Sequence, residues 1–190
     1  MRSSTRRLKE LVIFAVLGAI IFISYIALYG IPNVGFIGML IATYTITYRV
    51  KALIPMYIYI ALYGVFFGFV TMIPFLFVWL PLWGLFMIAG KFNLSVKVKV
   101  PLFMVLCALH GLSFGTLYAP FASLLFGIPF KFQTLLAWVI AGLKFDITHA
   151  LGNLAAGTLI VPLSMVLIKL DAQIMQNDTS ETVIKQEQES

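Results

Sequence analysis

The sequence predicts an all-α membrane protein, a bundle of six transmembrane helices with its N- and C-termini in the cytoplasm. Composition and the placement of charge carry this prediction. Of the 190 residues, 62% are hydrophobic and 11% are charged, and the mean hydropathy is +1.03. A soluble domain of this size leaves about 30% of its chain surface in water and needs polar groups there, whereas a lipid-facing surface does not. The chain therefore suits a bilayer.

Long uncharged runs define the expected spans. Residues 11–48 and 52–90 contain no Asp, Glu, Lys or Arg, and each run is long enough for two helices of about 20 residues. Each run also has a break signal near its middle, GIPN at residues 30–33 and TMIP at residues 71–74. Further uncharged runs follow Pro101 and Ile147. The expected spans lie near residues 11–29, 35–48, 52–70, 74–90, 101–126 and 143–168.

The basic residues predict the orientation, because Lys and Arg near span ends stay preferentially on the cytoplasmic side. They gather at the N-terminus, between spans 2 and 3, between spans 4 and 5, and after span 6. These residues are Arg2, Arg6, Arg7, Lys9, Arg49, Lys51, Lys91, Lys97, Lys99, Lys169 and Lys185. The opposite connections hold only Lys131, with Lys144 near the start of span 6. The net charge of +6 therefore reflects topology and contact with anionic lipid, and we expect no nucleic-acid partner.

The chain divides into a basic cytoplasmic N-terminus (1–10), a transmembrane domain (11–170) and a cytoplasmic tail (171–190). The tail is rich in Gln, Glu, Asp and Ser, a composition that predicts disorder. Basic residues precede the first apolar stretch, as they do in a secretory signal. However, this stretch runs from Leu11 to Leu28 and exceeds the usual length of about 7–15 residues. We therefore expect an uncleaved first span.

Several enzyme classes lack their sequence signals. The chain has no GxxxxGKS/T phosphate-binding loop and no HExxH metal motif. The single cysteine, Cys107, cannot form an internal disulfide or a thiolate cluster. We expect no catalytic residue, metal or cofactor. Active transport would then depend on an ion gradient or on a partner that hydrolyses ATP.

The sixth span contains the most informative polar residues. Asp146, His149 and Asn153 follow one another at spacings of three and four, so they share one helix face. Ionisable groups at membrane depth are costly and usually face a bundle interior or a wet cavity. Since span 6 starts outside, we expect an outward-facing pocket in which Asp146 binds a cationic or donor-rich group. Lys144 points elsewhere on a regular helix, but could pair with Asp146 if the helix begins later.

A packing role for the same residues stays open. Asp146 and His149 could satisfy each other or a neighbouring helix, as polar contacts between spans do. Other side chains carry weaker signals, since a lone histidine often bonds between helices and Trp and Tyr are common at the membrane interface. These weaker candidates are His110, Tyr118, Trp79 and Trp138, of which Trp138 directly precedes the polar face.

Small residues in span 1 form a second signal. Ala15 and Ala19 are separated by three residues, with Gly18 between them, and make a flat strip where another helix can approach closely. Gly64 and Gly68 make a similar strip in span 3. Either strip could serve internal packing or a partner.

Four features together resemble a known family. They are a basic N-terminus followed by AxxxA at residues 15–19, IPNV at 31–34, the aromatic FVW at 77–79 and GLKFDITHALGN at 142–153. Over residues 8–170 the chain is similar to the substrate-binding S components of the energy-coupling factor (ECF) transporters. These transporters are vitamin importers of ABC type, in which the small six-helix S component captures substrate for a shared module with two ATPases.

The resemblance implies partners and roles. Ala15 and Ala19 would face the membrane coupling subunit, with Phe14 standing where the family motif has a first alanine. Substrate would bind near the outer face, between span 6, neighbouring spans and the connections after spans 1, 3 and 5. Beside Asp146, His149 and Asn153, the implied ligand-binding candidates are Asn33, Trp79, His110, Tyr118 and Trp138. The protein would be a multi-pass component of a prokaryotic cell membrane and would have no catalytic residue.

Two other functions remain open on the residues alone. A stand-alone carrier or channel could use Asp146 and His149 to relay protons, although no inverted repeat is visible. An intramembrane enzyme could use the same pair as acid and base, but no metal-binding motif accompanies the pair in the sequence. The substrate also stays open among thiamine precursors, riboflavin, pantothenate, nicotinate-like compounds and cobalamin.

Overall fold

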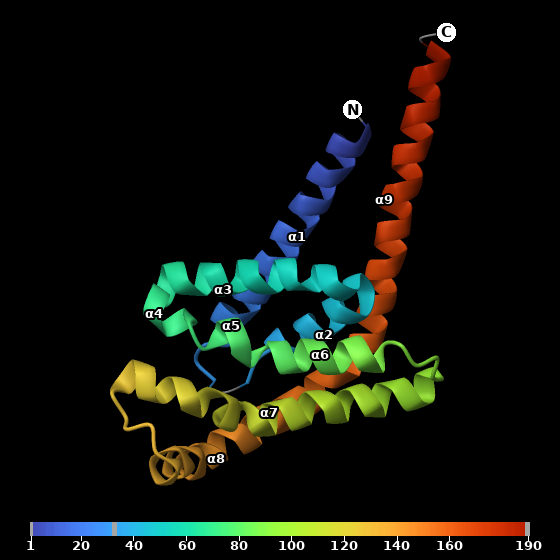
Figure 1. Cartoon of the computed structure of the whole chain (residues 1–190). Coiled ribbons are helices and arrows are strands. Elements are labelled where there is room, and N and C mark those ends of the chain that lie inside the picture. Colours follow the sequence, from blue (N-terminus) through green and yellow to red (C-terminus); the bar gives the residue numbers. More distant parts are fainter. Residues whose placement is uncertain (1, 32–33, 189–190) are drawn as a thin grey trace.

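The computed structural model describes residues 2–31 and 34–188, and within these ranges every regular element is helical (Figure 1). The all-α prediction is therefore confirmed. The α-helices are α1 (Arg2–Ala27), α2 (Ile37–Tyr48), α3 (Leu53–Phe67), α4 (Phe69–Met72), α5 (Phe75–Val78), α6 (Leu80–Ala89), α7 (Val96–Phe126), α8 (Phe132–Ala156) and α9 (Ile160–Gln188). Two short 3-10 turns, η1 (Arg49–Ala52) and η2 (Gly157–Leu159), join α2 to α3 and α8 to α9.

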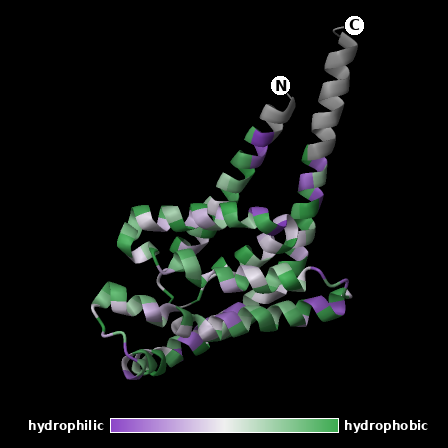
Figure 2. Ribbon diagram, in the orientation of Figure 1, coloured by the Kyte–Doolittle hydropathy of each residue, from purple (hydrophilic) through white to green (hydrophobic). Residues whose placement is uncertain are grey.

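Five helical stretches of the described chain are long and apolar enough to cross a membrane. They are Arg7–Ala27, Ile37–Phe67, Phe69–Ala89, Val96–Phe126 and Phe132–Ile174. The second stretch covers most of the two spans expected at residues 35–48 and 52–70, so the number of six spans stays a prediction. Hydrophobic residues dominate most of the helices (Figure 2). Large ones such as Phe66 and Phe69 are exposed. This surface is typical of a helical membrane protein.

Both predicted breaks interrupt the helices. α1 ends at Ala27 and α2 begins only at Ile37, on either side of the predicted GIPN signal, of which residues 32 and 33 lie outside the described ranges. The second break starts before TMIP, at Gly68, whose φ of 101° strongly favours glycine. The end of α7 lies at Phe126, as predicted, because Gly127 adopts a left-handed conformation with φ of 64°.

The last predicted span differs at both ends. α8 begins at Phe132 rather than near residue 143, because residues 132–141 contain neither Gly nor Pro and continue the helix. Lys144 is therefore inside a regular helix, with its ammonium 4.9 Å from the Phe145 ring centre. Residues 171–188, for which the composition predicts disorder, continue α9 as helix. They also lack Gly and Pro and are rich in Gln and Glu, which favour helix.

Glycines allow the closest helix contacts. A Cβ atom on Gly111 of α7 would lie 2.9 Å from the Ala150 backbone nitrogen of α8. A Cβ on Gly157 would lie 2.7 Å from the Cα of Met104, and one on Gly18 of α1 would lie 2.6 Å from the Ile58 side chain of α3. Small residues at such contacts let helix backbones approach closely in a membrane. The described ends of α1 and α9 lie on the same side of the molecule (Figure 1), an arrangement that suits an even number of crossings.

Candidate ligand-binding site

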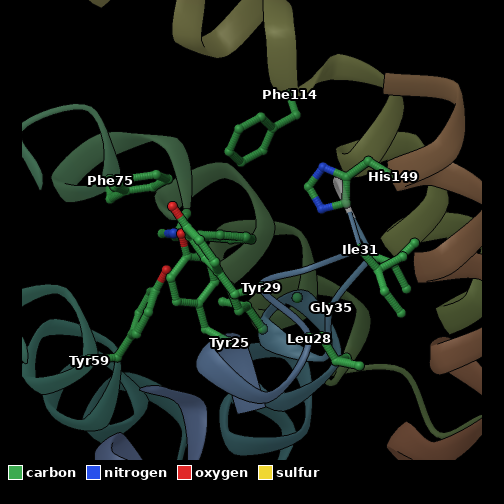
Figure 3. A pocket seen from close by; sticks show the side chains of 13 residues that line it. Tyr25, Leu28, Tyr29, Ile31, Gly35, Tyr59, Phe75, Phe114 and His149 are labelled. Atoms are coloured by element: carbon green, nitrogen blue, oxygen red, sulfur yellow. The ribbon is translucent and has the colours of Figure 1, made fainter. Parts of the chain in front are cut away.

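An aromatic pocket lies where the end of α1 and the following loop meet α2, α3, α5, α7 and α8 (Figure 3). Its volume is about 210 Å³. The loop contributes Ile31, Val34 and Gly35, on either side of two residues outside the described ranges. Ring side chains form most of the remaining wall. They are Tyr25, Tyr29, Tyr59, Phe75, Trp79, Phe114 and His149.

Contacts between rings hold this wall together. The ring centres of His149 and Phe114 are 4.9 Å apart, and the rings meet edge to face with an interplanar angle of 64°. Trp79 lies 5.6 Å from Phe114, and Tyr25 lies 5.7 Å from Tyr29, again between ring centres. Such tilted and edge-to-face pairs are favourable beyond the apolar area that they bury. The pocket is therefore built by interlocking rings from helices far apart in the sequence.

Two polar groups of the wall lack partners. The Tyr59 hydroxyl and the Trp79 Nε1–H are buried and have no hydrogen-bond partner among the described residues. The two side chains are 0% and 1% exposed. An unpaired buried polar group costs about 1–3 kcal/mol, and its presence calls for an explanation. A bound ligand with an acceptor group would supply the missing partner.

The predicted polar face of span 6 separates into two parts. The Asp146 carboxyl group is 5% exposed and accepts the Gly115 N–H of α7, at 3.0 and 3.1 Å from its two oxygens. Asn153 is also buried, and its side-chain amide donates to the Cys107 carbonyl at 3.3 Å. Both residues therefore join α8 to α7, as in the packing alternative. His149 is turned by about 60° from Asp146 around the helix and lines the pocket.

The weaker candidates differ in whether they line the pocket. Trp79 is part of the wall, and His110 supports it from behind, with ring centres 5.3 Å apart. The His110 Nε2–H donates to the Val78 carbonyl at 2.9 Å. Tyr118 stacks on Phe114 without lining the pocket. The other two candidates do not join this group, since Trp138 stacks on Phe126 and Asn33 lies outside the described residues.

Sequence reasoning missed the tyrosines and phenylalanines of the wall. Tyr25 and Tyr29 are four residues apart at the end of the first span, as Tyr59 and Tyr63 are in α3. This spacing places each pair on one helix face, which is the signal that could have found them. Uncharged aromatic residues are common in membrane helices, however, and their spacing alone does not separate a binding wall from ordinary packing.

The small residues of α1 lie on two sides of the helix. Gly18 packs on Pro55 and Ile58 of α3, whereas Ala15 is exposed and Ala19 is half-buried. Ala15 therefore belongs to the outer surface of the described structure. This surface is available to lipid or to another membrane protein.

The fold and the pocket together define the class, a helical membrane protein with a small aromatic cavity. Comparisons with protein-family models, with curated proteins and with solved structures found no match. In the part of the chain that the structure describes, no three His, Cys, Asp or Glu side chains come together to hold a metal ion.

Removing the Asp146 carboxyl group should weaken the contact between α7 and α8. We expect Asp146→Ala to lower the free energy of unfolding in detergent by about 1 kcal/mol, the usual size of such interhelical bonds. Asp146→Asn keeps an acceptor for the Gly115 N–H and should lose less. Exposed Lys144→Ala is the control. A loss of ligand affinity in Asp146→Ala with unchanged stability would instead place the carboxyl group in the binding site.

Proposed function

We propose that the chain is the membrane-embedded substrate-binding S component of an ECF-type ABC importer for a vitamin or vitamin precursor. The observation that carries this proposal is the aromatic pocket with two unpaired buried polar groups. Its walls come from the connection after the first span, from aromatic α5 and the adjoining Trp79, and from His149 in α8. These are segments that the family resemblance assigns to substrate binding.

The placement of the ionisable residues favours binding over proton relay or catalysis. A relay or an acid-base pair needs Asp146 and His149 to act on one another or on a shared group. Asp146 bonds to the Gly115 backbone between α7 and α8, whereas His149 packs on Phe114 at the pocket. His149 is thus suited to contact a ligand. A stand-alone ion-coupled carrier remains the alternative function.

The proposal includes the topology and the partners. Six crossings with cytoplasmic ends would leave the pocket open to the outside and bring α1 to a membrane coupling subunit. Two ATPase subunits would supply energy, since the chain has no phosphate-binding loop. The exposed side of α1 around Ala15 is the surface that we assign to the coupling subunit.

Bulky substitutions on α1 test this assignment. We expect Ala15→Trp or Ala19→Trp to reduce uptake at least tenfold and to abolish copurification of the coupling subunit, because an indole prevents close helix approach. Ligand affinity of the purified protein should stay the same, since neither residue lines the pocket. Ala141→Trp, at another exposed alanine in α8, is the matched control. Normal uptake by both α1 variants would refute the docking role.

A further inference from the structure

We propose that the ligand is an uncharged heteroaromatic compound, of one ring or a small fused pair, with a hydrogen-bond acceptor that meets Tyr59 and Trp79. This inference rests on the proposed binding function and narrows its substrate class. Four properties of the pocket lead to it: volume, aromatic walls, absence of charge in the described lining, and unpaired donors.

The volume limits the ligand to a small molecule. Drug-sized ligands occupy pockets of about 300–1,000 Å³, and an apolar cavity of about 150 Å³ holds benzene. At about 210 Å³, this pocket can enclose one substituted ring or a compact bicycle. A macrocycle such as cobalamin would not fit inside it.

The aromatic walls favour a flat ligand. Phe75 and Trp79 come from α5 and the residue that follows it, and Phe114 comes from α7. Tyr25 comes from α1, and Tyr29 follows the end of that helix. Figure 3 shows these labelled tyrosines and phenylalanines, with His149, surrounding the cavity from several directions. A planar ring can stack against some of these faces and meet the edges of others, which are the preferred aromatic geometries.

The pocket offers no counter-ion to a charged ligand. Its described lining contains no Asp, Glu, Lys or Arg, because Asp146 faces Gly115 instead. Burying an unpaired carboxylate or phosphate in such surroundings is strongly unfavourable. This argues against acids such as pantothenate and nicotinate.

An aromatic cage can also attract a cation, so the polar atoms of the wall decide between a cationic and an uncharged ligand. The Trp79 Nε1–H can only donate, and it has no partner in the described structure. A quaternary ammonium group has no acceptor to offer it. A ring nitrogen or carbonyl of an uncharged heterocycle does, and the Tyr59 hydroxyl, which points toward the surrounding rings (Figure 3), can donate to a second acceptor.

Compounds that share a ring and differ in charge test the inference. The intact purified protein would be titrated, by calorimetry and tryptophan fluorescence, with pyridine and pyrimidine sets, each offered in uncharged, carboxylate and N-methylated cationic forms. One set is nicotinamide, nicotinate and 1-methylnicotinamide. We expect an uncharged member of at least one set to bind, with both charged partners at least tenfold weaker. Best binding by a carboxylate or a cation, equal binding of all three forms, or no binding in any set would overturn the inference.

Conservative variants then test the two donors with the best uncharged compound. Tyr59→Phe and Trp79→Phe keep the rings and remove one donor each, and each should weaken binding by about threefold to tenfold. The controls are Tyr57→Phe on the same helix and Trp138→Phe, neither of which lines the pocket. Unchanged affinity in both pocket variants would contradict the assigned contacts. Failure of the charge test leaves copurification with ATPases unaffected, so it is distinguishable from failure of the proposed function.

Discussion

Substitution of Gly111 by leucine will destabilise the membrane domain by about 3 kcal/mol or more. The added Cβ would lie 2.9 Å from the Ala150 nitrogen and 3.0 Å from its Cα, closer than atoms pack without displacement. Because these are backbone atoms of α8, no side-chain rotation can relieve the contact, and the two helices must separate. Overpacking of this kind typically costs 1–3 kcal/mol and more where backbone must move. Denaturant unfolding of the detergent-solubilised protein measures the loss.

Gly142→Leu is the matched control for Gly111→Leu. Gly142 also lies in the α7 and α8 pair, but a Cβ atom there would meet no heavy atom within 4 Å. We expect its stability to equal or slightly exceed that of the parent, since leucine favours helix over glycine. Equal stability of the two variants would show that α7 and α8 do not approach each other at Gly111.

Filling the pocket from its loop will abolish ligand binding, with a loss of affinity of at least about 100-fold. Gly35 lines the pocket, and a Cβ atom there meets no heavy atom within 4 Å, so Gly35→Phe can be accommodated without a backbone clash. A benzyl group occupies much of a cavity of about 210 Å³. It therefore takes the place of a ligand ring and should leave the fold intact. Calorimetric titration and unfolding measurements on the same sample separate these two effects.

Gly30→Phe controls for a bulky residue in the same connection. A Cβ atom on Gly30 would also meet no heavy atom within 4 Å, but Gly30 does not line the pocket. The ligand affinity of the Gly30→Phe variant should stay within about threefold of that of the parent protein. Retained binding in Gly35→Phe, or an equal loss in both variants, would show that the ligand does not occupy this cavity.

The elements that sequence could predict are those with a local physical cause. Gly127 ends α7 where the sequence places a break, and Pro and Gly signals mark both breaks between the early helices. α8 begins at Phe132, before the expected start of span 6 near residue 143, because a helix continues through a charge such as Lys144 wherever propensity allows. The number of spans and their orientation remain predictions.

The candidate site was predicted only in part. A polar helix face indicates that its residues are buried, but it does not indicate which helix or cavity each residue contacts. Asp146 and His149 share a broad helix face, but Asp146 contacts α7 and His149 lines the pocket. Which residue faces which neighbour depends on the position of Gly115 and Phe114, a tertiary fact. Trp79 could be chosen as a candidate from its residue type alone. The tyrosines of the wall come together only because the fold packs α1 against α3.

Native mass spectrometry of the protein, expressed at its natural level and extracted gently, tests the central claim most directly. If the chain is the binding subunit of an ECF-type importer, it will carry a small uncharged adduct and copurify with a membrane coupling subunit and two ATPases. A protein that carries neither adduct nor partners under these conditions would contradict the account and favour a stand-alone carrier.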